Sequence, residues 1–176
     1  DTIKIICKLP SELTLNRGIS GSSVTNDLVI SINGTTDKLT IQNYFSGSQY
    51  KIEQVQFDDG TVWGASELAA ASIVPTGTTL YATPDNDLID LRNAANTFVD
   101  GPYSASGVDA GNDTYLFAAG SGHDTIRDAD STAGNIDTIR FAAGLTANDI
   151  TVSRNQTDLY LGINGTTDNI RVQNWF

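Results

Sequence analysis

The chain has 176 residues, of which 39% are hydrophobic, and this is enough to bury the core of one or two small domains. Its formal net charge of −11 comes from eighteen Asp and only three Glu against ten basic residues. An acidic chain without a basic cluster is unsuited to nucleic acid. No apolar run is long enough to cross a membrane, and the single Cys7 excludes an internal disulfide and a cysteine-based metal site.

A block of nineteen residues occurs twice in the chain. Residues 27–45 recur as residues 158–176, with eleven positions identical. The similarity extends upstream when six extra residues near residues 18–23 are allowed for. We therefore predict a repeat array, in which residues 1–74 are the C-terminal part of one module and residues 75–176 are the N-terminal part of the next. The chain is expected to be a window cut from a longer protein.

Taken in order, residues 1–6 form an apolar pattern that predicts a strand. Alternating apolar residues on both sides of Asn33-Gly34 predict a hairpin, because Asn and Gly tolerate the positive φ of tight turns. The second copy repeats this pattern around Asn164-Gly165. A further hairpin is predicted to turn at residues 58–60. A short helix is predicted over residues 66–71, with Ser66 as its N-cap.

Residues 80–141 follow a different pattern. Three short segments each contain a small or turn residue, an Asp two positions later and a large apolar residue two positions after that. The Asp and apolar pairs are Asp87 and Ile89, Asp113 and Tyr115, and Asp124 and Ile126. We predict a turn followed by a very short strand in each, with the Asp in the turn and the apolar side chain in the core.

This pattern resembles the RTX (haemolysin-type) calcium-binding repeat proteins, whose repeat is Gly-Gly-x-Gly-x-Asp-x-U-x, with U a large apolar residue. The best match is at residues 119–127, where Gly120, Gly122, Asp124 and Ile126 occupy the family positions. The hairpin block ending at residues 173–176 resembles the module that accompanies such repeats. The predicted fold is all-β, with a short, irregular parallel β-roll or solenoid flanked by antiparallel β-hairpins in a repeat array.

Calcium takes six to eight oxygen ligands from carboxylates and backbone carbonyls. The resemblance implies that Asp124 binds it with the carbonyls around Gly120 and Gly122, and Asp113 with those around Gly111. Asp87 with Asp85 is a weaker match. Asp128 and Asp130, followed by Asp137, form a separate acidic loop. The alternative is that these Asp residues only form turns. Irregular spacing and missing glycines argue against a long, regular calcium ladder.

Catalysis is not supported, because His123 is the only histidine and no catalytic set has a framework. We therefore predict that the chain is not an enzyme. An exposed face of aromatic side chains is a further alternative, with glycan binding through Trp63, Tyr44, Tyr50, Trp175 and Phe176. The strand periodicity, however, places Phe45 and Phe176 with the core.

The leading hypothesis is a non-enzymatic calcium-binding repeat region of a large secreted bacterial protein. The resemblance implies type I secretion in an unfolded state and folding on calcium (Ca²⁺) outside the cell or at its surface. The expected partners are neighbouring repeat modules of the same chain and an extracellular or cell-surface glycan or protein. The alternatives are a calcium-independent structural or adhesive module, and an accessory fragment of a secreted enzyme or toxin.

Overall fold

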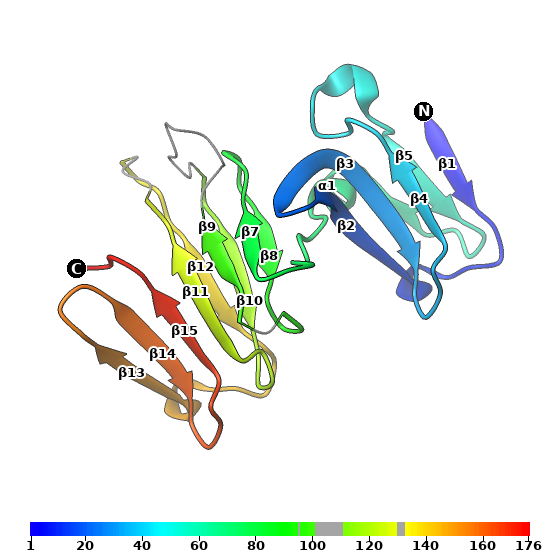
Figure 1. Ribbon diagram of the computed structural model, residues 1–176. Coiled ribbons are helices and arrows are strands. Elements are labelled where there is room, and N and C mark those ends of the chain that lie inside the picture. Colours follow the sequence, from blue (N-terminus) through cyan, green and yellow to red (C-terminus); the bar gives the residue numbers. More distant parts are fainter. Residues whose placement is uncertain (95, 101–110, 130–132) are drawn as a thin grey trace. The chain divides into compact units, whose positions relative to one another are not determined.

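The computed structural model describes residues 1–94, 96–100, 111–129 and 133–176, which form mostly β-strands (Figure 1). The predicted all-β class is confirmed. The chain divides into two compact units. Unit 1 consists of Asp1–Gly18 with Thr25–Ile73, and unit 2 of Ile19–Val24 with Val74–Phe176. Within the described ranges, no helix is long and apolar enough to cross a membrane.

Unit 1 is built from hairpins and one short helix. Its elements are β1 (Thr2–Ile5), β2 (Leu13–Ser20), β3 (Ser23–Ile32), β4 (Lys38–Ile41), β5 (Gln54–Phe57), β6 (Val62–Trp63), α1 (Ala65–Ala69) and 3-10 turns at Pro10–Glu12 and Ser48–Tyr50. Strand β5 pairs in parallel with β1 and antiparallel with β6. The core gathers Leu28, Tyr44, Val55 and Leu68, all fully buried, so alternation along the strands produces a one-sided apolar face.

Unit 2 begins with strands that alternate between two parallel sheets. Its strands are β7 (Thr79–Tyr81), β8 (Leu88–Asp90), β9 (Phe98–Asp100), β10 (Thr114–Phe117), β11 (His123–Arg127), β12 (Thr138–Phe141), β13 (Ile150–Arg154), β14 (Leu159–Ile163) and β15 (Asn169–Val172), with a 3-10 turn at Ala147–Asp149. One sheet runs β7-β9-β11-β15 and continues antiparallel through β14 and β13; the other runs β8-β10-β12. Ile89, Tyr115 and Ile126 are buried as predicted.

Aspartate side chains connect successive strands of these parallel sheets. An Oδ1 atom of Asp113 accepts the N–H of Asp87 at 2.8 Å, and Asp137 accepts the N–H of Asp113 at 2.9 Å. In the other sheet, Asp124 accepts the N–H of Thr97 at 2.7 Å. Each of these carboxylates therefore accepts a backbone N–H from 24 to 27 residues earlier, and Asp137 also accepts from Asn135 in its own turn. Of Asp87, Asp113 and Asp124, all described by the structure, Asp87 is the one that bonds locally, to Thr83.

Both predicted Asn-Gly hairpins are confirmed, and they share one register. Leu28 pairs with Ile41 in the first copy, as Leu159 pairs with Val172 in the second. Gly34 and Gly165 take φ of 76° and 79°.

The asparagines of these two turns have a different role from the one we predicted. Neither Asn33 nor Asn164 has a positive φ. The side chain of Asn33 instead accepts from Thr14 and donates to the carbonyl of Ser11, and Asn164 does the same with Thr151 and Asn148. Each asparagine therefore ties its hairpin to the preceding 3-10 turn.

The six extra residues of the first copy lengthen its β2–β3 hairpin. The tip of this hairpin, Ile19–Val24, belongs to unit 2, although the sequence predicts it within the first module. There Ser23 pairs in parallel with Tyr81, and the Tyr81 N–H donates to the carbonyl of Ser22 at 2.7 Å. The insertion therefore covers the edge of β7, the first strand of the parallel sheet.

Helix α1 and the hairpin at residues 58–60 also form where predicted, but the N-cap prediction is wrong. The N-cap is Gly64, and the side chain of Glu67 accepts its N–H at 2.8 Å. Ser66 lies inside the first turn and donates to Glu67. A glutamate three residues into a helix satisfies a free backbone donor, which here removes the need for a capping serine.

Substitution of Gly111 tests how closely its backbone packs against the backbone of Asp85. A Cβ at this residue, whose φ is +143°, would lie 2.8 Å from the carbonyl carbon and oxygen of Asp85, whereas nothing lies within 4 Å of a Cβ at Gly134, at φ +90°. Since overpacking costs about 1–3 kcal/mol, we expect Gly111→Ala to lower the free energy of unfolding by that much more than Gly134→Ala. Denaturant unfolding of both variants measures the difference, and equal losses would contradict it.

Candidate metal centre

Three aspartates from separate strands converge in unit 2. Asp113 precedes β10, Asp128 follows β11 and Asp137 precedes β12. One carboxylate oxygen from each lies within 4.8 Å of the others. Because calcium–oxygen distances are about 2.3–2.6 Å, two ligands of one ion lie at most about 5 Å apart. The three oxygens therefore fit a single calcium ion, which takes hard oxygen donors of this kind.

Hydrogen bonds orient these side chains. Asp137 accepts the N–H of Asp113 through one oxygen and the side-chain amide of Asn135 at 2.7 Å through the other. The hydroxyl of the buried Tyr115 lies 3.5 Å from Asp128 Oδ2, to which it donates. The carboxylates therefore lie at set positions before any ion is bound, which lowers the cost of assembling a site.

The electrostatics of Asp113 favour a cation. Asp113 is 2% exposed, and burial raises the pKa of its carboxyl to about 7, with the charges of Asp87, Asp128 and Asp137 acting in the same direction. The hydrogen bond from the Asp87 N–H opposes this increase. Three arginines of unit 2 are bound to other carboxylates, in the pairs Arg92–Asp90, Arg127–Asp100 and Arg171–Asp158. A divalent ion would remove the repulsion at Asp113.

The cluster borders a hollow of about 380 Å³ in unit 2. Asp128 and Asp137 contribute its polar rim, and its apolar wall includes Ile139, Leu161 and Trp175. Asp137 is exposed, so water has access to the cluster. Water supplies the ligands that a few carboxylates leave open in calcium sites.

The Gly120–Gly122 turn, predicted to offer carbonyls to calcium, binds a carboxylate in the structure. The N–H groups of Gly120 and Gly122 each donate to Asp168 at 2.8 Å. The carbonyl of Gly122 accepts the N–H of Asn169. These two N–H bonds hold the pKa of the Asp168 carboxyl below its usual range. We did not predict this role of Asp168, although its position in the duplicated block was a signal.

Asp124 lies apart from the three-aspartate cluster, in the other parallel sheet. It is 1% exposed, and its Oδ2, like the Oγ1 of Thr97, has no hydrogen-bond partner in the described part of the chain. Burial raises the pKa of the Asp124 carboxyl to about 7, and the hydrogen bond from Thr97 and the charge of His123 oppose this. Asp124 is therefore a buried carboxylate with one unbonded oxygen, and within the described ranges it belongs to no group of three acidic, histidine or cysteine side chains that could hold a metal.

The other predicted ligands have different surroundings. Asp87 bonds Thr83, Asp85 is exposed, and Gly111 lies against the backbone of Asp85. Asp130 lies outside the described residues. Of the ten predicted positions, the structure brings Asp113, Asp128 and Asp137 together.

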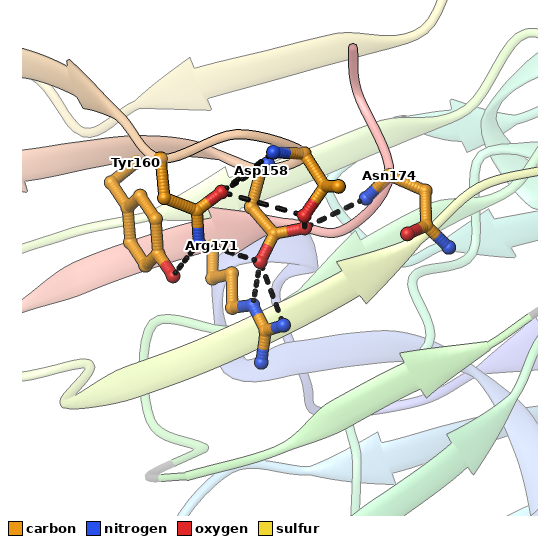
Figure 2. Close-up of polar contacts among 6 residues, drawn as sticks. Asp158, Tyr160, Arg171 and Asn174 are labelled. Carbon is orange, nitrogen blue, oxygen red and sulfur yellow. Dashed lines mark hydrogen bonds and ion pairs between the residues drawn. The ribbon is translucent and has the colours of Figure 1, made fainter.

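Asp158 shows how this fold stabilises a buried carboxylate without a metal (Figure 2). It is 1% exposed, and Arg171 approaches it with Nε at 2.8 Å and Nη2 at 2.7 Å. The N–H of Asn174, whose φ is 59°, also donates to it, as does the hydroxyl of Thr157. These bonds, the Asn174 N–H foremost, hold the pKa of Asp158 far below its usual range, against the opposing effect of burial. Asp158 therefore has a structural role that the sequence did not reveal.

Asp27 is the counterpart of Asp158 and provides a matched comparison. It accepts the N–H of Asn43 at 2.8 Å, but Thr40 stands where the second copy has Arg171. Asp158→Ala would remove the ion pair with Arg171 together with the bond from the Asn174 N–H, whereas Asp27→Ala would remove hydrogen bonds from the Asn43 N–H and Thr25. We therefore expect Asp158→Ala to lower the free energy of unfolding clearly more than Asp27→Ala, as measured by denaturant unfolding. Similar losses would show that Arg171 contributes little.

The raised pKa of Asp124 predicts a pH dependence of stability. Its folded-state pKa of about 7 lies above the unfolded value of about 3.9. Folding therefore disfavours the ionised form, and stability falls as the pH rises from about 4 to about 7. In excess chelator, we expect the melting temperature to fall over this range, and to fall less in Asp124→Asn. An unchanged slope in that variant would contradict the assignment.

Comparison with known families finds a match at both copies of the hairpin block. The model of the haemolysin-type calcium binding protein related domain matches residues 27–67 and 158–176. The predicted resemblance to the module that accompanies RTX repeats is thereby confirmed. Both matches begin at the repeated aspartate, Asp27 or Asp158, and the three-aspartate cluster lies outside them. No curated protein and no solved structure matches the chain.

Proposed function

We propose that the chain is a non-enzymatic calcium-binding repeat region of a large secreted bacterial protein. The convergence of Asp113, Asp128 and Asp137 carries this proposal, because its spacing and oxygen chemistry suit calcium. The match to a haemolysin-type calcium-binding-related domain supports the same metal.

In this proposal the ion acts as a cross-link between the two parallel sheets. Asp128 follows β11 in one sheet, whereas Asp113 and Asp137 precede β10 and β12 in the other. The alternation of strands between these sheets is the short, irregular β-roll that we propose for unit 2. A bound ion would join its two walls and offset the repulsion at the buried Asp113.

The same electrostatics suit export before folding. At the low calcium concentration inside a cell, the clustered carboxylates repel one another and weaken the folded state. Outside, millimolar calcium would bind the native state alone and stabilise it. Passage through a type I secretion system in an unfolded form, followed by folding outside the cell or on its surface, is the route we propose.

A calcium-independent structural or adhesive module is the second candidate. The observation that favours it is that backbone N–H groups already bond several of the aspartates. The aromatic face proposed for glycan binding does not form as a whole, because Tyr44 is fully buried. Phe176, predicted to lie in the core, is 52% exposed beside Trp175 at 60%, so a smaller aromatic surface is available in unit 2.

Calcium titration with a designed variant separates these candidates. We expect the melting temperature in millimolar calcium to exceed that in chelator by several degrees, with no such gain in magnesium. Calcium at 100 times its dissociation constant would add about 2.7 kcal/mol. Asp113→Asn keeps an acceptor for the Asp87 N–H but removes the strained charge. It should therefore be more stable than the parent chain in chelator at neutral pH, yet gain less from calcium.

Asp85→Asn is the matched control, since Asp85 is exposed and lies outside the cluster. It should retain the full calcium response. Equal melting of the parent chain in chelator, calcium and magnesium would reject calcium binding and favour the structural module. An undiminished calcium response in Asp113→Asn would place the ion elsewhere.

A further inference from the structure

The two copies of the hairpin block differ at one strand edge. Strand β4 is the counterpart of β15, and both pair with the preceding strand in the same register. β15 also pairs on its other side with β11, in parallel. Among the described strands, β4 pairs with β3 alone. The outer edge of β4 therefore lacks the neighbour that its counterpart has.

Burial shows the same difference. Ile170 of β15 is fully buried, whereas its counterpart Leu39 is 42% exposed. Asp168 is 8% exposed, whereas its counterpart Asp37 is exposed. A hollow adjoins this edge, and its lining, all within unit 1, is Ile5, Leu13, Ile30, Ile32, Asp37, Lys38 and Leu39. An open strand edge beside an apolar hollow is a template for strand addition.

The second copy shows what kind of segment fits such an edge. Strand β11 lies along β15, and the N–H groups of the two glycines before it, Gly120 and Gly122, donate to Asp168. The backbone adds bonds from Asn169 to the Gly122 carbonyl and from Gln173 to the Ile126 carbonyl. Gly120 and Gly122 have φ of 91° and 81°, a conformation that favours glycine. The carboxylate of Asp168 therefore suits a strand that follows a Gly-x-Gly turn, because it accepts the N–H groups of both glycines.

Unit 1 keeps the groups that would make these contacts. The N–H of Asp37 is held by Thr35 Oγ1 at 3.1 Å, as that of Asp168 is held by Thr166 at 3.0 Å. Across the described chain, the carboxylate of Asp37 makes no hydrogen bond. The N–H of Gln42 has no backbone acceptor there, whereas the N–H of its counterpart Gln173 donates to the Ile126 carbonyl. The acceptor and the donor are thus both present and available.

We propose that the outer edge of β4 binds, in parallel, a strand led by a Gly-x-Gly turn, with Asp37 accepting the two glycine N–H groups. The occupant has the chemistry of residues 119–127 and comes from another copy of the module. Alternating apolar side chains of the added strand would cover Leu39 and the hollow beside it. This inference rests on the internal repeat and is independent of metal binding.

The test uses the 176-residue chain labelled with ¹⁵N and a synthetic peptide with the sequence of residues 118–127. We expect the peptide to shift the amide resonances of residues 37–42 and to slow hydrogen exchange at Gln42 by about tenfold or more. A peptide with alanine at both glycines should have no such effect. Asp37→Asn should weaken binding at least tenfold, whereas Asp59→Asn, in an exposed turn of the same unit, should bind as the parent does.

Several results would overturn the proposal. The first is that the peptide leaves residues 37–42 unaffected at millimolar concentration. The second is that the alanine peptide binds equally, or that Asp37→Asn has no effect, since binding would then not involve the turn. Protection of Gln42 that depends only on protein concentration would mean that a second β4 edge occupies the site, and would also reject the proposed occupant.

Discussion

The structure of unit 2 depends on aspartate carboxylates that accept backbone N–H groups from residues 24 to 27 positions earlier in the chain. Asp113 satisfies the N–H of Asp87, and Asp137 satisfies that of Asp113. A buried donor left without a partner costs about 1–3 kcal/mol, so these bonds set where each short strand begins. They also bring carboxylates close together, and the arrangement that orders the strands thereby creates the negative cluster at Asp113, Asp128 and Asp137.

The buried carboxylates of unit 2 have different hydrogen-bond and charge environments. Asp158 lies against Arg171 and the Asn174 N–H, and its pKa is lowered. Asp168 has two glycine N–H groups. Asp113 has one N–H bond and several negative neighbours, and its pKa is raised. The first two contribute to stability at neutral pH without an ion, whereas Asp113 weakens the fold until a cation or a proton arrives. In the proposed function, stability and calcium binding are therefore coupled through a single class of residue.

The two copies of the duplicated block show that the surrounding strands and helix decide which of their side chains are buried. Tyr44 and Trp175 occupy corresponding positions in the two hairpin blocks, yet Tyr44 is fully buried and Trp175 is 60% exposed. In unit 1 the strand β5 and helix α1 belong to the same core as Tyr44. Leu39 and Ile170 show the reverse contrast, since β11 covers the second copy. A module of this kind completes its core with segments from outside the hairpin, as repeat architectures do.

The sequence alone determined the all-β class, the repeat, the Asn-Gly hairpins and the buried positions of Ile89, Tyr115 and Ile126, because periodicity and turn chemistry are local properties. It also indicated the resemblance to the calcium-binding-related module. Only the tertiary structure decided which aspartates meet, since parallel pairing of β10 with β12 brings Asp113 and Asp137 together, and Asp128 joins them from the end of β11 in the other sheet. The sequence did not predict the partners of Asp158 and Asp168 for the same reason. Sequence does not distinguish an aspartate that faces water from one that faces an arginine or a backbone N–H, and only the neighbours in space decide between these roles.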